Sequence, residues 1–134
     1  MNYLTLLEIA DLLSETLSFE HITAGSIDNA IEKTVGVYQR RDFMPRGCLG
    51  AASSYETAKI RLLVRWGTNP TETEAKAAEL GELIQSLRDA PTASHIIKFA
   101  DLKAVRAIGK DEKGVCEYVV DADIIYTERN DKNG

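Results

Sequence analysis

The fold is decided by residues 55–91, YETAKIRLLVRWGTNPTETEAKAAELGELIQSLRDAP, in which two hydrophobic periods follow one another. From 58 to 66 apolar residues alternate with bases, which predicts a strand with one face in the core and one basic face. The bases are Lys59, Arg61 and Arg65. After residue 70 the apolar residues recur three and four apart, which predicts an amphipathic helix.

The ends of this helix carry their own signals. Thr71 and Glu74 form a capping-box pattern directly after Pro70, and Pro91 is expected to end the helix. The expected buried stripe consists of Ala77, Leu80, Leu83, Ile84 and Leu87.

Towards the N-terminus the pattern predicts another helix, over residues 3–17. Its acids fall mostly between apolar residues, and the apolar arc is wide enough to pack on a sheet and also to meet a partner chain. Residues 22–27 and 30–38 read as strands joined by a turn at Asp28-Asn29. Residues 39–54 lose all periodicity and are expected to form a long mobile loop that carries function. The expected stripe of the helix is Tyr3, Leu6, Leu7, Ala10, Leu13 and Leu17, widened by Leu4, Ile9 and Leu12.

Towards the C-terminus the chain is expected to be β again. Residues 96–102 and 104–110 predict two strands, residues 111–114 a turn closed by glycine, and residues 115–127 a long strand. The tail, 129–134, is expected to fray. The order of elements predicts a single α+β domain over 1–134, with two main helices packed on a mixed, mostly antiparallel sheet.

The 134 residues carry 16 Lys and Arg against 21 Asp and Glu, a net charge of −5. An acidic chain is unsuited to coating nucleic acid, which needs a basic footprint. The charge is unevenly distributed, however: residues 1–32 carry −6, residues 33–65 carry +5 and the remainder −4. Neighbouring segments this polarised predict oppositely charged surfaces. No apolar run is long enough to span a membrane, and the first residues lack the features of a signal peptide.

Residues with catalytic or metal-binding potential are few. A His–Cys nucleophile pair is conceivable, but no local pattern supports it, and surface or capping histidines are favoured. The spacing of these residues does not fit a zinc site, and the glycines at 47 and 50 do not form a phosphate-binding loop. We therefore expect no catalytic, cofactor or metal residues, and no enzyme. The chain has two histidines and two cysteines: His21, His95, Cys48 and Cys116.

Acidic residues of the last strand raise one further metal hypothesis. Asp121 and Asp123 share a strand face and could bind a divalent cation together with Asp101. Acids on the wet face of an antiparallel strand are more often solvated, and this interpretation is favoured.

The loop at 39–54 contains the best candidates for contact with a partner. Arg40, Arg41 and Arg46 lie close in sequence to Phe43 and Met44, a basic patch with apolar anchors. Contact with a protein partner is favoured, because Phe43 and Met44 stand in an exposed segment. Contact with the backbone of nucleic acid and a solvated loop are the alternatives.

Taken together, the order of segments resembles a known family. AIEKTVGVYQRR, the strand RLLVRWG before a helix, and the closing strand CEYVVDADIIYTE are similar to minor capsid proteins of phages and prophages of Gram-positive bacteria. They also resemble the tail terminator and tail-completion proteins of long-tailed phages. The resemblance covers residues 3–128.

This resemblance implies a non-enzymatic virion protein with an α+β fold, made in the cytoplasm of the host bacterium and needing no cofactor. It implies a ring, commonly of six copies, that joins the tail tube to the head connector. A head-completion protein of the same junction is the alternative, contact with passing DNA is a further candidate, and a small enzyme or ligand-binding domain is less favoured.

A ring places different faces of neighbouring copies together, which suits a polarised chain. The sequence therefore predicts that acids of the first helix in one copy meet bases of the next copy. The acids are Glu8, Asp11 and Glu15, and the bases are Arg40, Arg41, Arg46, Arg61 and Arg65.

Overall fold

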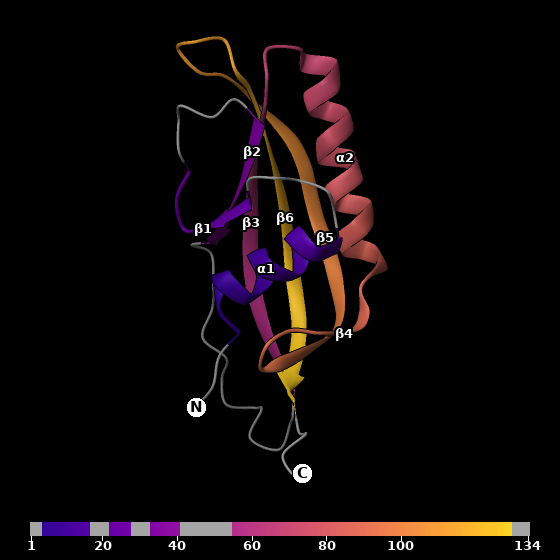
Figure 1. Cartoon of the computed structure of the whole chain (residues 1–134). Helices are drawn as coiled ribbons and strands as arrows, with labels where there is room; N and C mark the ends of the chain where they lie inside the picture. The colour runs from indigo at the N-terminus through magenta and orange to yellow at the C-terminus, as the bar shows by residue number, and fades with distance from the viewer. Residues whose placement is uncertain (1–3, 17–21, 28–32, 41–54, 130–134) are drawn as a thin grey trace.

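The computed structural model describes residues 4–16, 22–27, 33–40 and 55–129. They form two helices and six strands, and the expected α+β fold is confirmed (Figure 1). The elements in chain order are α1 (Leu6–Thr16), β1 (Ile22–Ala24), β2 (Lys33–Gln39), β3 (Glu56–Trp66), α2 (Pro70–Ser86), β4 (Arg88–Pro91), β5 (His95–Lys110) and β6 (Cys116–Glu128).

The strands form one sheet in the order β1-β2-β3-β6-β5-β4. Only β1 and β2 run parallel, and all other neighbours are antiparallel. Both helices cover the same face, α1 over β1 and β2, and α2 over β5, β6 and β3 (Figure 1). The alternation in β3 is confirmed on this face, where Ile60, Leu62 and Val64 are buried in the core. The other face of the sheet carries no described helix.

The start of α2 differs from the capping-box prediction. Asn69, not Thr71, is the N-cap, and its side chain accepts hydrogen bonds from the backbone N–H groups of Thr71 and Glu72, at 2.9 and 3.3 Å. Pro70 then occupies the first helical position, where its missing N–H costs nothing. The sequence signal for a helix start was right, but the cap lies two residues earlier.

The end of α2 was predicted too late. The helix ends at Ser86, and residues 88–91 form β4 instead of a last turn. Arg88 pairs with Phe99, and Ala90 with Ile97 on β5. Strand pairing competes with the helix here, and the partner strand is not visible from the local sequence.

The first helix also differs in detail from its pattern. Thr5 caps α1, because its hydroxyl accepts a hydrogen bond from the Glu8 N–H at 3.2 Å. Leu7, expected in the stripe, is 61% exposed, whereas Ile9 is buried beside Ala10. The buried face of α1 is therefore rotated from the expected one.

The two strands predicted at 96–102 and 104–110 are one long strand, β5. Its pairing with β6 shifts register three times, at bulges that include Lys98, Lys103 and Ile108. Each bulge inserts an extra residue into β5 and interrupts the alternation that the sequence pattern depends on. The turn at 111–114 is confirmed, and Gly114 closes it with φ +85°, a conformation that favours glycine.

Candidate subunit-contact surfaces

The bases of the predicted interface lie on the helix-free face of the sheet. In the pairing of β3 with β6, Lys59 is opposite Asp123, Arg61 opposite Asp121 and Arg65 opposite Glu117. Opposite charges at directly facing positions of an antiparallel pair attract one another. The bases of β3 therefore lie opposite acids of β6 in the same chain.

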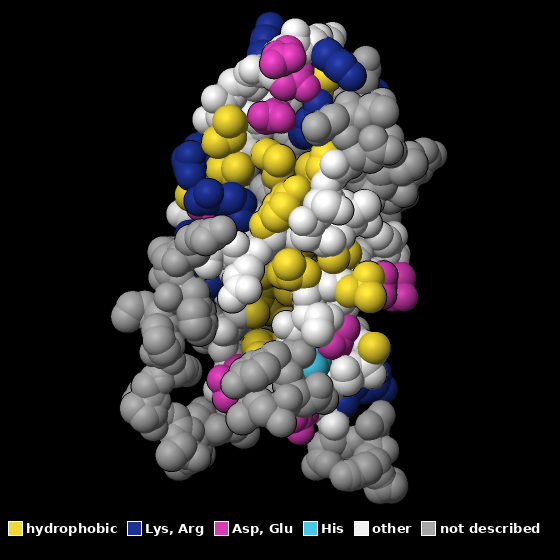
Figure 2. Space-filling view, turned by 90° about the vertical axis from the view of Figure 1, so that its left-hand side faces the viewer, with side chains coloured by type: hydrophobic (Ala, Val, Ile, Leu, Met, Phe, Trp, Pro, Cys, Tyr) yellow, Lys and Arg dark blue, Asp and Glu magenta, His cyan; other side chains and the backbone are white. Residues whose placement is uncertain are grey.

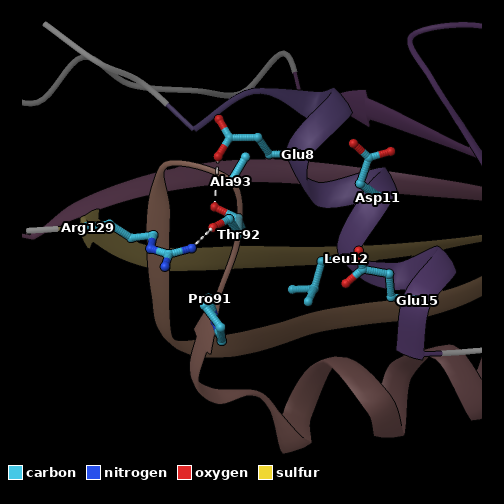
Figure 3. Close-up of a pocket in the computed structure, with 8 residues that line it drawn as sticks. All are labelled: Glu8, Asp11, Leu12, Glu15, Pro91, Thr92, Ala93 and Arg129. Atoms are coloured by element: carbon cyan, nitrogen blue, oxygen red, sulfur yellow. Dashed lines mark hydrogen bonds between the residues drawn. The ribbon is translucent and has the colours of Figure 1, made fainter. Parts of the chain in front are cut away.

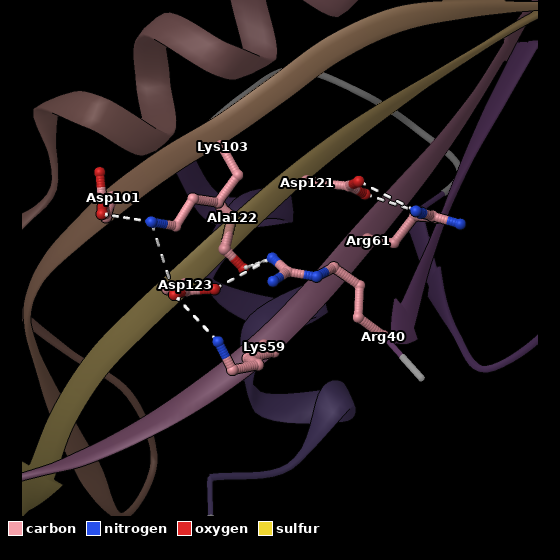
Figure 4. A network of polar contacts seen from close by, with 8 residues as sticks. All are labelled: Arg40, Lys59, Arg61, Asp101, Lys103, Asp121, Ala122 and Asp123. Atoms are coloured by element: carbon pink, nitrogen blue, oxygen red, sulfur yellow. Dashed lines mark hydrogen bonds and ion pairs between the residues drawn. The ribbon is translucent and has the colours of Figure 1, made fainter. Parts of the chain in front are cut away.

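Asp123 is the centre of a group of ion pairs among the described residues (Figure 4). Its carboxylate lies 3.0 Å from Arg40 Nη1, 3.3 Å from Lys59 Nζ and 4.0 Å from Lys103 Nζ. Lys103 also pairs with Asp101 at 3.0 Å. Arg40 is only 8% exposed and further donates to the carbonyl of residue 122, so this side chain is held within its own subunit.

Arg61 and Arg65 are engaged in the same way. Arg61 forms a bidentate salt bridge with the Asp121 carboxylate, in which its Nε and Nη2 atoms donate hydrogen bonds of 2.7 and 2.9 Å. Arg65 is 1% exposed, and its guanidinium meets Glu117 at 3.2 Å and also Asp111. A cation this deeply buried depends on its acids, because desolvation without them is very costly.

The acids of β6 are not solvated as expected. Asp121 and Asp123 are buried, at 8% and 9% exposure, and both are neutralised by bases. Asp101 does face Asp123 across the strands, as the cation hypothesis requires. However, Lys103 lies between the two carboxylates, and no cluster of three or more potential metal ligands occurs among the described residues.

The histidine and cysteine expectations are resolved in part. His95 is fully buried, so the interpretation as a surface residue is wrong. Cys116 is a buried free thiol. His21 and Cys48 lie outside the described residues, as do the loop residues Arg41, Phe43, Met44 and Arg46 and the Asp28-Asn29 turn.

A polar cluster that the sequence did not reveal surrounds Glu8. Its Oε1 atom accepts hydrogen bonds from the Thr92 hydroxyl at 2.7 Å and from the Ser94 N–H and hydroxyl, both at 3.2 Å. His95 Nδ1 lies 3.0 Å from the same oxygen, and the His95 ring packs edge-on against Tyr126. Glu8 thus joins α1 to the turn between β4 and β5.

This cluster changes the acidity of Glu8. Burial alone would raise the pKa of Glu8, but hydrogen bonds from His95, Thr92 and Ser94 outweigh it and lower the pKa from 4.5 to about 2. Glu8 is therefore ionised across the physiological range and belongs to the fold of its own subunit.

The other two acids of α1 line a groove (Figure 3). Asp11 and Glu15 stand on one wall, and Pro91, Thr92 and Ala93 form the opposite wall. The groove has a volume of about 350 Å³ and also includes Leu12 and Arg129, whose guanidinium donates to the Thr92 carbonyl at 2.7 Å. Asp11 and Glu15 are exposed and form no ion pair with any described residue.

The residues of the predicted interface are therefore divided. The structure brings Glu8, Asp11 and Glu15 together on α1, but separates them from Arg40, Arg61 and Arg65 on the helix-free face of the sheet. Two charged surfaces result, one already neutralised within the chain and one with acids still available.

The comparison with known families agrees with the resemblance seen in the sequence. A model of the family described as bacteriophage tail terminator protein matches residues 7–128. The chain belongs to this family. A comparison with curated proteins finds no significant match. As a tail terminator, the chain is a structural protein of the phage virion with a role in completing the tail.

The surface of this tail terminator has segregated side-chain types. Figure 2 shows hydrophobic side chains along the middle of one side, with Lys and Arg side chains along one border. Neither described helix combines the length and apolar character needed to cross a bilayer.

Proposed function

We propose that this tail terminator forms a ring at the head–tail junction, by contacts between different faces of neighbouring copies. The acids Asp11 and Glu15 carry the proposal, since they are exposed beside a groove and form no ion pair with the rest of the described chain. Charge left available on one surface of a subunit favours association with a complementary surface of another copy.

The pairing of charges within the chain changes the expected interface. Arg40, Arg61 and Arg65 neutralise acids of β6, so bases elsewhere on the neighbouring copy are better suited to meet Asp11 and Glu15. Arg41, Phe43, Met44 and Arg46 remain part of the proposal, as contacts to a neighbouring copy or to another protein of the junction.

The proposed location follows from the family. The ring is expected to consist of six copies, to contact the tail tube protein and the head connector in the virion, and to be made in the cytoplasm of the host. Direct binding of the passing DNA is not favoured, because Arg40 of the predicted basic patch and the arginines of β3 already pair with acids of the same chain.

Assembly can be tested directly. The mass of the purified chain, alone and bound to tail tubes, would be measured by light scattering and by electron microscopy of the tube ends. We expect a ring at the end of the tube that faces the head. A wild-type chain that stays monomeric and leaves tube ends bare would refute the proposal.

A charge reversal tests the surface. The variant Asp11→Lys/Glu15→Lys is expected to lose assembly while it keeps its fold, as judged by circular dichroism. The matched control reverses two exposed acids of α2, Glu74→Lys/Glu82→Lys, and is expected to assemble normally. Equal behaviour of the two variants would mean that the surface of α1 is not the contact.

A further inference from the structure

We propose that the end of the β5–β6 hairpin in one copy, with Ile108 as its anchor, docks in the groove between α1 and the β4–β5 turn of the next copy. This inference rests on the ring-forming function proposed above and names the two surfaces that meet. We call the hairpin end, residues 105–114, the arm.

The outer edge of β5 is open in the arm, whereas on its inner side β6 is still paired with β3 as far as Glu117. β4 pairs with β5 only from Ile96 to Phe99, and no described strand lies on the outer side of β5 beyond that point. All residues from 105 to 110 are exposed. An edge of this length normally carries features that prevent unwanted pairing.

The bulges of β5 show which part of this edge is protected. The first bulge, at Lys98, lies where β4 already pairs with β5. The second, at Lys103, lies on the open edge, and a bulge with a lysine is a common device against edge-to-edge pairing. The third bulge contains Ile108, which is 49% exposed. An apolar residue at the position where the other bulges have lysine indicates a contact made by the side chain, because the bulge itself interrupts regular strand pairing.

The groove offers a matching site for such an anchor. Leu12, Pro91 and Ala93 supply apolar side chains to its lining, and its volume of about 350 Å³ lies in the range of pockets that hold small ligands. One isoleucine side chain and part of the adjoining backbone would fit within it. These three apolar side chains would contact the anchor, and the charged residues of the lining, among them Asp11 and Glu15, would lie beside it.

The charges around the anchor and the groove are complementary. Arg106 and Lys110, on either side of Ile108, are exposed and form no ion pair within the described parts of the chain. Asp11 and Glu15 of the groove are likewise exposed and form no ion pair with a described residue. Two bases flanking an apolar anchor and two acids beside the apolar part of the groove would pair in one docked arrangement.

The arm of a subunit cannot fill the groove of the same subunit. The groove lies beside the first residues of β5 and the arm contains its last residues, so the length of the 16-residue strand, about 50 Å, separates them. Figure 1 shows the hairpin turn and β4 at opposite ends of the sheet. The contact therefore has to join different copies, and a ring closes if β5 runs around its circumference.

Cross-linking tests the contact in the assembled protein. In a Cys48→Ser background, the pair Ile108→Cys with Ala93→Cys is expected to form disulfides between copies under mild oxidation, giving a ladder of covalent oligomers on a non-reducing gel. The control pair, Ile108→Cys with Gln85→Cys, places the second cysteine on exposed α2 and is expected to give none. Assembled particles without cross-links in the first pair would overturn the inference.

Substitution of the anchor gives a second test. Ile108→Asp is expected to raise the concentration at which half of the chain is assembled by at least about tenfold. Phe99→Asp changes an apolar residue of similar exposure, 46%, at the other end of β5, and is expected to have little effect on assembly. Arg106→Glu is expected to weaken assembly, and the combination with Glu15→Arg to restore it.

The outcomes separate this inference from the proposed function. If the wild-type chain forms rings and Ile108→Asp forms them equally well, the ring-forming function stands and the docking of the arm is wrong. If the wild-type chain never assembles, the proposed function itself fails. If Ile108→Asp forms rings but no longer binds tail tubes, the arm contacts the tube and not a second copy, which also overturns the inference.

Discussion

Two charged regions of the molecule behave in opposite ways. On the helix-free face of the sheet, Arg40, Arg61 and Arg65 each contact an acid of the same chain, and the side chains of Arg40 and Arg65 are buried. In the groove beside α1, Asp11 and Glu15 are exposed and form no ion pair within the described residues. The first region holds the subunit together, and the second has charge available for another molecule.

The difference shows what a polarised sequence can and cannot indicate. A block of bases next in sequence to a block of acids suggested that the two would meet between copies. The structure instead pairs the bases with acids some 60 residues later, because β3 and β6 are neighbours in the sheet. The separation of acids and bases along the sequence predicts that these charges will be paired, whereas the order of the strands decides which acid each base meets.

The largest expected effect concerns the buried cation. Arg65→Ala should lower the free energy of unfolding by about 3–5 kcal/mol, since it leaves Glu117 and Asp111 without their shared partner. The measurement is equilibrium denaturation in urea. Arg106→Ala, which removes an exposed arginine, should change the same quantity by less than about 0.5 kcal/mol. Similar losses in both variants would remove the distinction between the two regions.

Next in size is the polar cluster of Glu8. Glu8→Gln should lower the free energy of unfolding by about 1.5–3 kcal/mol, because the neutral amide cannot replace the charged acceptor of four groups. Denaturation at neutral pH is the measurement. Glu15→Gln, on the same helix, is the control and should remain close to the wild type.

The same residue gives a dependence on pH. The pKa of Glu8 is lowered in the folded state to about 2 from 4.5, so its contribution is complete above pH 4.5 and is lost as pH falls towards 2. Thermal unfolding of the wild type should therefore become easier across this window. Glu8→Gln should show a smaller change over the same interval, and an identical profile would contradict the assigned pKa.

A smaller effect is expected for the pair at the margin of the ion network. A double-mutant cycle of Arg61→Ala and Asp121→Ala should give a coupling free energy of about 1 kcal/mol, since Arg61 remains partly exposed to solvent. The exposed pair Lys76–Glu79 on α2 should give no more than about 0.5 kcal/mol in the same kind of cycle. Equal couplings would show that cross-strand placement adds nothing.

The smallest effect on folding belongs to the groove. Asp11→Lys/Glu15→Lys should change the free energy of unfolding by less than about 0.5 kcal/mol, because neither acid contributes an ion pair to the described fold. Urea denaturation of the monomer provides the measurement. A large destabilisation would mean that these acids serve the fold, as Glu8 does, and that loss of assembly in this variant cannot be assigned to the surface.

Much of the fold could be predicted from local patterns. The alternation in β3 and the helical period of α2 were read correctly, because each element has one face in the core and its neighbours enforce that face. The predictions failed where a distant partner decides the outcome. Residues 88–91 form β4 and not the expected last turn of α2, because they pair with β5. The bulges of β5 interrupt its alternation, so the sequence pattern predicted two strands where there is one.

The candidate site was less predictable than the fold. The acids of the first helix were expected mostly between its apolar positions, and Asp11 and Glu15 are exposed. Nothing near Glu8 in the sequence indicates that it contacts residues 92–95. Histidine, threonine and serine around residue 95 are common types with no distinctive spacing. Their contact with Glu8 exists only because α1 packs beside the β4–β5 turn.

By itself, the sequence determined the α+β class, the main helices, the basic face of β3 and the resemblance to tail terminators, since these depend on residue type and local spacing. The tertiary structure decided which charges are already paired, because ion pairs form between neighbours in space and β6 lies next to β3. It also placed Ile108 at a bulge on an open edge and the acids of α1 beside a groove. Those positions depend on strand order and register, which no local pattern in the sequence specifies.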